Sequence, residues 1–151
     1  MAVLNAMGDF KRDISFHVLK RDDGQICLTA GLTDRYHDIR MEVLVDFETL
    51  VVTAARVDFI RSPSRDCPNV AKRMGGLVGF TIGKGLSRKI LEILGGGEGC
   101  GNLRVLLMGM LPLAMNVKAA DGFDDEQEML DSIQERLQGS CAGYVRADEN
   151  R

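Results

Sequence analysis

Long uninterrupted apolar runs are missing from this sequence, so we expect neither a membrane span nor an export signal. Its longest apolar segment, residues 105–117, is interrupted by Pro112 and Asn116, and a helix needs roughly twenty apolar residues to cross a bilayer. The first ten residues contain Asp9 and lack both the basic start and the long apolar middle of a signal peptide. We therefore expect a cytoplasmic protein with no membrane partner.

Excess positive charge and closely spaced cysteines are also missing. The net charge is −3, and no run of Lys and Arg is interleaved with aromatic residues, so we expect no nucleic-acid partner. None of the four cysteines lies in a C-x-x-C pair, the spacing that strongly indicates a zinc or redox site. In a reducing compartment these cysteines are expected as thiols or ligands rather than as disulfides. No hydrolase signature is present either.

What is present fits a globular protein of ordinary size. The 151 residues are 45% hydrophobic and 27% charged, which suits one domain able to bury roughly two-thirds of its unfolded surface. The sequence predicts a partly ordered N-terminus over residues 1–12, a single domain over 13–145 and a frayed tail over 146–151. We find no internal repeat or linker that would divide the domain.

The first part of the chain has the alternation of strands. Apolar Ile14, Phe16 and Val18 alternate with polar neighbours, as in a half-buried strand. Residues 21–24 then form a hairpin turn in which Gly24 can adopt a positive φ. Similar patterns follow up to residue 59. This part predicts a four-stranded antiparallel meander over about residues 12–60.

The second part changes to the period of helices. Apolar positions in residues 70–78, 86–94 and 103–111 follow helical spacing, and Pro112 is expected to end or kink the third helix. A fourth helix is expected to open at Asp124, with Gln127 as its capping-box partner. Its expected buried stripe consists of Met129, Leu130, Ile133 and Leu137. The fold prediction is therefore α+β, with about four helices packed on one face of the sheet.

The first candidate site is the glycine-rich loop over residues 95–101. This loop delivers Cys100 to the start of the third predicted helix, where free N–H groups and the helix dipole favour an anion. The predicted ligand-binding residues are Gly97, Gly99, Cys100, Gly101 and Asn102. The alternative is a tight helix-to-helix turn, because the Gly-Lys-Ser/Thr ending of a P-loop is missing.

The second candidate site is a metal centre at the ends of the predicted elements. Cys67 precedes the first helix, Cys100 opens the third and Cys141 follows the fourth. Together with His37 they would supply four ligands for a soft metal or an iron–sulfur cluster. In the alternative reading, each cysteine is a small buried apolar residue. His37 and Asp38 are neighbours whose side chains would point to opposite faces, so we predict a solvated loop there and not a catalytic dyad.

The order of several short motifs resembles that of a known bacterial family. These motifs are Arg21-Asp22-Asp23-Gly24, Leu32-Thr33-Asp34, His37-Asp38-Ile39, Val45-Asp46, Pro63 followed by Cys67, Leu77-Val78-Gly79, Ile82-Gly83 and Gly99-Cys100-Gly101-Asn102-Leu103. From about Asp13 to about Tyr144, the chain resembles domain-of-unknown-function family 2889. The resemblance implies a cytosolic single-domain protein and brings no established activity.

One departure from that family affects the site predictions. Members typically read Gly-Cys-Thr-His-Leu where this chain has Gly99-Cys100-Gly101-Asn102-Leu103, so Asn102 stands where the family has histidine. An asparagine does not shuttle protons near neutral pH and is a poor ligand for soft metals.

Three classes of function remain open from the sequence. The first is an uncharacterised binding domain that takes a small ligand or a metal at the helix-end cysteines, with an iron–sulfur scaffold of the U type as an analogy in layout. The second is an enzyme that uses Cys100 as a nucleophile. The third is a structural module that forms homo-oligomers through residues 70–79 or 108–115. The sequence identifies neither a cofactor nor a reaction.

Overall fold

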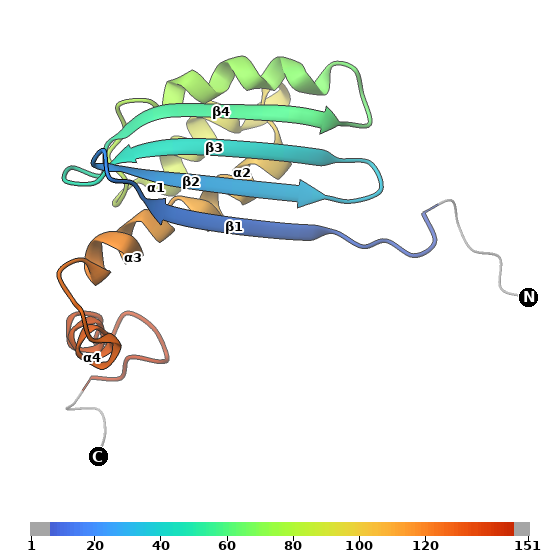
Figure 1. Cartoon of the computed structure of the whole chain (residues 1–151). Coiled ribbons are helices and arrows are strands. Elements are labelled where there is room, and N and C mark those ends of the chain that lie inside the picture. Colours follow the sequence, from blue (N-terminus) through green and yellow to red (C-terminus); the bar gives the residue numbers. More distant parts are fainter. Residues whose placement is uncertain (1–6, 147–151) are drawn as a thin grey trace, which may run out of the picture. The chain divides into compact units, whose positions relative to one another are not determined.

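The computed structural model describes residues 7–146, so parts of the predicted N-terminal segment and of the predicted tail lie outside the described residues. Four strands form one antiparallel sheet in the order β1-β2-β3-β4, as the alternation predicted. Their bounds are β1 Asp13–Lys20, β2 Gln25–Thr33, β3 Asp38–Asp46 and β4 Val52–Arg61. Short turns join consecutive strands, which makes a meander (Figure 1).

Helices follow the sheet, so the predicted α+β class is confirmed. They are η1 Cys67–Leu77, α1 Leu86–Leu94, η2 Gly96–Glu98, α2 Gly101–Met110, α3 Leu113–Ala120 and α4 Glu126–Arg136. The segment around residues 70–78 is a 3₁₀ helix and not an α-helix. Gly75 and Gly76 within it disfavour the α-helical conformation. Leu111 and Pro112 separate α2 from α3, as the proline predicted.

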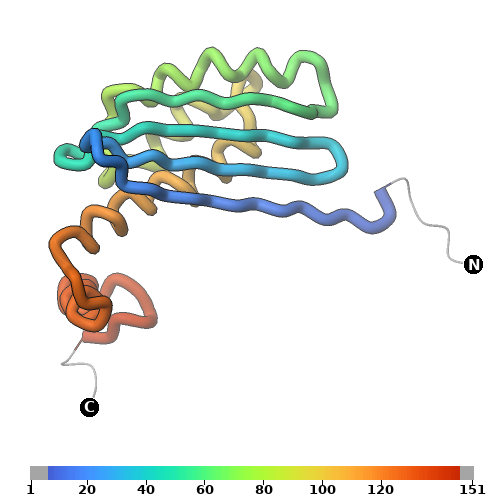
Figure 2. The backbone as a smooth tube through the Cα atoms, in the orientation of Figure 1, coloured from blue at the N-terminus to red at the C-terminus, as the bar shows by residue number. Residues whose placement is uncertain are grey.

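The chain forms two compact units, Met1–Val117 and Lys118–Arg151. The boundary between them lies inside the domain that the sequence predicted over residues 13–145. Figure 2 traces the path of the chain through both units. Each unit is described by itself below.

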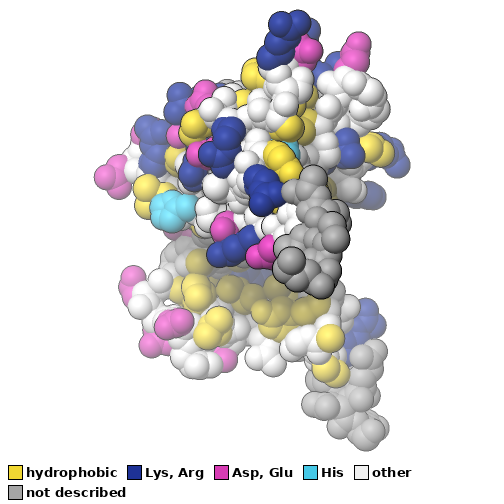
Figure 3. Space-filling model, turned by 90° about the vertical axis from the view of Figure 1, so that its right-hand side faces the viewer, with side chains coloured by type: hydrophobic (Ala, Val, Ile, Leu, Met, Phe, Trp, Pro, Cys, Tyr) yellow, Lys and Arg dark blue, Asp and Glu magenta, His cyan; other side chains and the backbone are white. Residues whose placement is uncertain are grey.

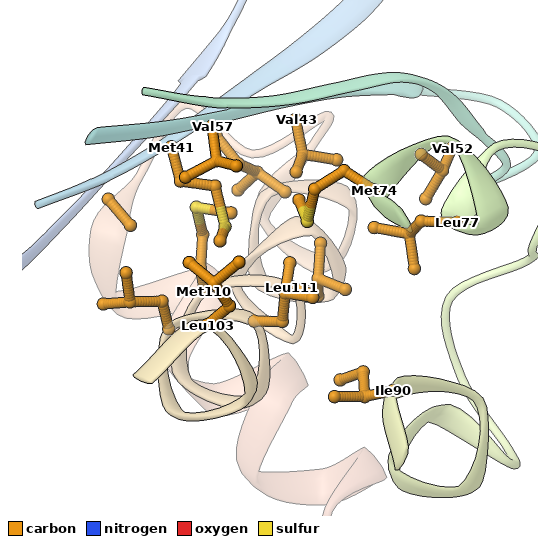
Figure 4. Packing of buried hydrophobic residues seen from close by; sticks show 14 of the residues in the cluster. Met41, Val43, Val52, Val57, Met74, Leu77, Ile90, Leu103, Met110 and Leu111 are labelled. Carbon is orange, nitrogen blue, oxygen red and sulfur yellow. The ribbon is translucent and has the colours of Figure 1, made fainter. Parts of the chain in front are cut away.

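In the first unit, the helices cover one face of the sheet. η1 packs against β4, α2 packs against β2 and β1, and α1 packs against η1 and α2. Met41 and Val43 of β3 face Met74 of η1 and the α2 residues Leu103 and Met110 across the core (Figure 4). All five side chains are at most 2% exposed. Burial of this apolar surface is the main stabilising contribution to the unit.

Residues Gly101–Ala120 are long and apolar enough to span a membrane by length and composition alone. In the structure, 33% of the apolar window within this stretch is buried. Leu103, Leu106, Leu107 and Met110 of α2 are all 0% exposed and face the helix-covered side of the sheet.

The second unit differs from its prediction in two details. The N-cap of α4 is Asp125 and not Asp124, and its carboxylate accepts the N–H of Glu128 at 2.8 Å. The expected buried stripe is also wrong, because no residue of α4 is buried in the described structure, and Leu130 is 46% exposed. The helical periodicity was correct, but the residues of its own unit do not bury the apolar face of α4.

Candidate functional site

A buried carboxylate lies in the turn between β2 and β3. Among the described residues, Asp34 is the one polar or charged residue that is buried. Its Oδ1 accepts the backbone N–H groups of Tyr36 and His37, both at 2.8 Å. A short acidic side chain that bonds the backbone two and three residues ahead is a common way to stabilise a tight turn. The turn therefore fixes the carboxylate at the end of the sheet.

Two further side chains bind the same carboxylate. Nε of Arg12 donates to Oδ2 at 2.8 Å, and Nδ1 of His37 lies 2.9 Å from Oδ1. Burial alone would raise the pKa of Asp34. The hydrogen bonds from His37, Tyr36 and Arg12 outweigh this and hold the pKa well below its usual range. Asp34 is therefore an anion that the fold stabilises.

These contacts close into a ring of four side chains, which we call the Asp34 ring: Arg12, Asp34, His37 and Asn102. Nη1 of Arg12 donates to Oδ1 of Asn102 at 3.0 Å, and Nδ2 of Asn102 lies 3.2 Å from Nε2 of His37. In the tautomer with its hydrogen on Nδ1, which faces the carboxylate, Nε2 of His37 accepts the amide N–H of Asn102. Every contact in the ring is thus a donor facing an acceptor.

The ring joins segments that are far apart in the sequence. Arg12 precedes β1, Asp34 and His37 belong to the β2–β3 turn, and Asn102 lies in the first turn of α2. At the end of β4, Nη2 of Arg61 donates to the carbonyl oxygens of Asp34 at 2.7 Å and His37 at 3.2 Å. The ring therefore ties the edge of the sheet to the helix layer.

This geometry corrects the prediction for His37. The sequence placed it beside Asp38 in a solvated loop, whereas its side chain is 15% exposed and pairs with Asp34. Sequence reasoning missed Asp34, Arg12 and Arg61 as members of the cluster. A signal was available, because an aspartate three residues before His37 has the spacing of a side-chain-stabilised turn.

The second feature is a cavity of about 360 Å³ between η1 and the glycine-rich loop. Both Cys67 and Cys100 line it, and each is partly buried. The other lining residues are Asp66, Asn69, Val70, Lys72, Arg73, Gly97, Glu98 and Gly99. The structure thus brings together two of the three cysteines predicted as metal ligands, Cys67 and Cys100, and two further residues predicted to bind a ligand, Gly97 and Gly99. We call this the two-cysteine cavity.

Arg73 fixes the wall of this cavity. Its Nε donates to the carbonyl oxygen of Ile93 at 2.6 Å, and its Nη1 donates to Oε2 of Glu98 at 3.2 Å. The guanidinium therefore anchors η1 to the end of α1 and to η2. Arg73 is about one-third exposed, whereas Glu98 is almost fully exposed.

Only some glycines of the loop are required by close packing of the backbone. A Cβ at Gly99 would collide with the carbonyl of Leu94, and one at Gly95 would collide with the carbonyl of Leu91. These two glycines are required by the close approach of the chain to the end of α1, as a tight turn demands. A Cβ at Gly97 would meet no atom within 4 Å. Gly97 borders the cavity without a packing requirement.

The first turn of α2 opens beside this cavity. Cys100 is the N-cap, and its side chain makes no capping hydrogen bond. The first N–H groups of a helix have no acceptor within the helix. Here they belong to Gly101, Asn102 and Leu103. The positive end of the α2 dipole is therefore uncapped next to Cys100.

Two predicted metal ligands remain, His37 and Cys141. His37 belongs to the Asp34 ring, and Cys141 is exposed in the Lys118–Arg151 unit. Among the described residues, no group of three or more His, Cys, Asp and Glu side chains is arranged to hold a metal ion. The four-ligand set thus has no support within residues 7–146.

A second cavity, also about 360 Å³, lies on the face of the sheet that the helices do not cover. It includes Gly31, whose lack of a side chain leaves room for the guanidinium of Arg40. Arg40 pairs with Asp38 and Arg56 pairs with Glu42, so charge of both signs is already matched there. On a different side of the molecule, the one at the right of Figure 1, basic and acidic side chains are also interspersed (Figure 3). This cavity gives no preference for a ligand of one charge.

The fold and the two sites define an α+β protein with an antiparallel sheet, a covering helix layer and polar features at the start of α2. Residues 10–116 match the model of a family described as a protein of unknown function, DUF2889. The chain belongs to this family, and both the Asp34 ring and the two-cysteine cavity lie within the matched residues. No curated protein and no solved structure matches the chain.

Proposed function

We propose that this protein binds a small anionic molecule in the two-cysteine cavity. The observation that carries the proposal is the uncapped start of α2, which opens beside a cavity of about 360 Å³. A cavity of this size is within the range of small-molecule sites. Backbone N–H groups at a helix start bind phosphate or carboxylate groups without a side-chain motif.

The charged side chains around the cavity are balanced in number. Lys72 and Arg73 contribute positive charge, and Asp66 and Glu98 contribute negative charge. Glu98 is already paired with Arg73 at 3.2 Å. Among the charged lining residues, this leaves Lys72 as a cation and Asp66 as an anion. The preference for an anion therefore comes from the positive end of the α2 dipole. Lys72 is exposed, so it can turn towards a bound anionic group.

The two thiols favour binding over nucleophilic catalysis. No histidine lines the cavity within the described part of the chain, and His37 is held by Asp34 and Asn102. An imidazole base for Cys100, as in cysteine hydrolases, is therefore lacking at this place. The thiols contribute a polarizable wall that accommodates the less polar part of a ligand.

A soft metal is the second candidate, because two thiols line one cavity. Thiolates bind soft cations, although two of them do not complete a tetrahedral site. Elemental analysis of protein purified without a metal-affinity tag or chelator tests this candidate. Stoichiometric bound metal would favour it over the anion, and metal-free protein would exclude it.

The anion proposal is tested with inorganic phosphate and inorganic pyrophosphate as probes. We expect saturable shifts of the amide signals of residues 97–103 in ¹⁵N-labelled protein and weaker binding in Lys72→Ala. Lys84→Ala is the matched control, because Lys84 is an equally charged, exposed residue outside the cavity. Absence of saturable shifts, or equal weakening in both variants, would overturn the proposal.

A second readout uses the thiols themselves. Pyrophosphate bound at the start of α2 is expected to slow alkylation of Cys100 by iodoacetamide. Alkylation of Cys141, which lies in the other unit and is exposed, is expected to be unchanged. Equal slowing at both thiols would indicate a general effect of ionic strength and would count against the site.

A further inference from the structure

β1 is the outer strand of the sheet. It pairs with β2 on one side, and no other described strand pairs with it (Figure 1). It is eight residues long and mostly exposed. An edge of this kind presents a row of main-chain donors and acceptors that can template another strand.

The register identifies which main-chain groups face outward. The N–H of Arg21 donates to the carbonyl of Gln25 at 2.8 Å, so the 21–25 pair is hydrogen-bonded. In an antiparallel ladder hydrogen-bonded pairs alternate, which directs the groups of Ser15, His17 and Leu19 towards β2. The N–H and C=O groups of Ile14, Phe16 and Val18 therefore face away from the sheet.

The features that usually protect an edge are missing from this stretch. The pairing of β1 with β2 has no bulge, and no proline or charged residue lies between Asp13 and Lys20. The opposite edge is different. Val52 at the start of β4 exchanges hydrogen bonds with Gly79 and Phe80, and η1 packs along β4.

The side chains above these open groups are apolar and partly exposed. Ile14 is 39% exposed and Phe16 is 37% exposed, and Val18 packs against the core. Phe16 lies against α2, since a Cβ at Gly109 would collide with its ring. Open main-chain groups and an apolar row therefore occur on the same three residues.

We propose that β1 is a self-association surface on which β1 of a second copy of this chain pairs antiparallel. A two-fold axis through Phe16 places Phe16 opposite Phe16 of the second copy and Ile14 opposite Val18. This register matches apolar with apolar at each of these positions and forms about six main-chain hydrogen bonds. The result is a continuous eight-stranded sheet with the helices of both copies on one side.

The polar face of β1 is complementary in the same register. Ser15 lies opposite His17 of the second copy, which suits a hydrogen bond. Asp13 lies directly opposite Leu19 of the second copy, which is 54% exposed in the single chain, and diagonal to Arg21, within reach of a long side chain. A shift of the register by two residues would place Lys20 opposite Ile14 in one direction and Arg12 opposite Val18 in the other, and either shift would lose part of the apolar match. The sequence of the strand thus favours its own copy as the partner.

The test uses the full chain without substitutions. Molar mass from light scattering is expected to rise from one chain to two as the protein is concentrated from about 5 µM to about 500 µM. Over the same range, amide exchange at Ile14, Phe16 and Val18 is expected to slow at least about tenfold. Ser15, His17 and Leu19 bond to β2 in both states, so their exchange serves as the internal reference.

Each other result overturns the proposal. A single chain at every concentration excludes self-association. A dimer in which Ile14, Phe16 and Val18 exchange as fast as in dilute protein has a different interface. Concentration-independent protection of these three amides indicates that another part of the same chain covers the edge.

A pair of variants checks the surface independently. Ile14→Lys places a charge opposite Val18 of the second copy and is expected to keep the protein monomeric at about 500 µM. Ile60→Lys is the matched control, because Ile60 is a 64% exposed isoleucine on β4, and it is expected to dimerise like the wild type. Dimerisation of Ile14→Lys, or loss of the dimer in Ile60→Lys with thermal unfolding unchanged, contradicts the proposed surface.

Discussion

The amide Nδ2 of Asn102 lies 3.2 Å from Nε2 of His37, although 65 residues separate the two along the chain. The contact joins the first turn of α2 to the β2–β3 turn. Because the other ring nitrogen of His37 is held by Asp34, the histidine has a hydrogen-bond partner on both sides. Asn102 thus completes a ring that orients His37 and leaves neither of its nitrogens free for another ligand.

Removal of this amide should destabilise the protein. Asn102→Ala leaves Nε2 of His37 and Nη1 of Arg12 without their partner in the ring, and we expect a loss of about 1–3 kcal/mol in the free energy of unfolding. Urea denaturation followed by circular dichroism measures it. Asn69→Ala changes an exposed asparagine and should be nearly neutral. A neutral Asn102→Ala would show that the ring contributes little to stability.

Neutralising the buried carboxylate should have a larger effect. Asp34→Asn removes the anion that Arg12 and His37 face, and loss of one partner from a buried charged cluster costs about 3 kcal/mol. The same denaturation experiment measures this loss, with the exposed Asp58→Asn as control. If the two variants unfold alike, Asp34 does not stabilise the turn as we infer.

The free energy of unfolding of the wild type should decrease as the pH is lowered and Asp34 becomes protonated. The folded state holds the pKa of Asp34 below its usual value, so between that pKa and about 3.9 the unfolded chain binds more protons than the folded one. The stabilisation from Asp34 is therefore complete above about pH 5 and is lost as the pH falls below about 4. Urea midpoints measured from pH 6 to pH 2 should fall more steeply for the wild type than for Asp34→Asn. Parallel curves would contradict the assignment.

The glycine-rich loop offers a matched pair of substitutions. Gly99→Ala would drive a Cβ into the carbonyl of Leu94, whereas Gly97→Ala meets no atom within 4 Å. We expect Gly99→Ala to lower the free energy of unfolding by at least about 2 kcal/mol and Gly97→Ala to have a small effect. Thermal unfolding of both variants measures the difference. Equal midpoints would mean that the loop relaxes without cost.

The cysteines should differ in their reactivity. Burial, followed by the charge of Glu42, raises the pKa of the Cys27 thiol, and a higher pKa leaves less of the reactive thiolate at a given pH. Cys141 is exposed. Iodoacetamide labelling with mass-spectrometric readout from pH 7 to pH 10 should therefore show Cys141 modified first and Cys27 at higher pH. Labelling of Cys27 at or below the pH that labels Cys141 would contradict this order.

Local patterns were sufficient for the sheet and for most helix boundaries. The alternation at Ile14, Phe16 and Val18, and the turn closed by Gly24, predicted the first hairpin that the structure contains. Pro112 correctly separated α2 from α3. These features follow from backbone sterics and from side-chain periodicity, which act over a few residues.

The candidate sites were only partly predictable. The sequence indicated a candidate ligand-binding loop around Cys100. The structure adds that Cys67 and Cys100 line one cavity. It gave no indication that Arg12 or Asn102 would meet His37. The stripe of α4 was misassigned as buried because periodicity shows that a face is apolar without showing what covers it.

By itself, the sequence determined the order and type of the elements, the thiol state expected of the cysteines and the family resemblance. The tertiary structure decided which charges and thiols share a site. The Asp34 ring is assembled from the segment before β1, the β2–β3 turn and α2. Such a cluster depends on how the sheet and the helix layer pack, and packing is a long-range consequence of burying the core that no short stretch of sequence contains.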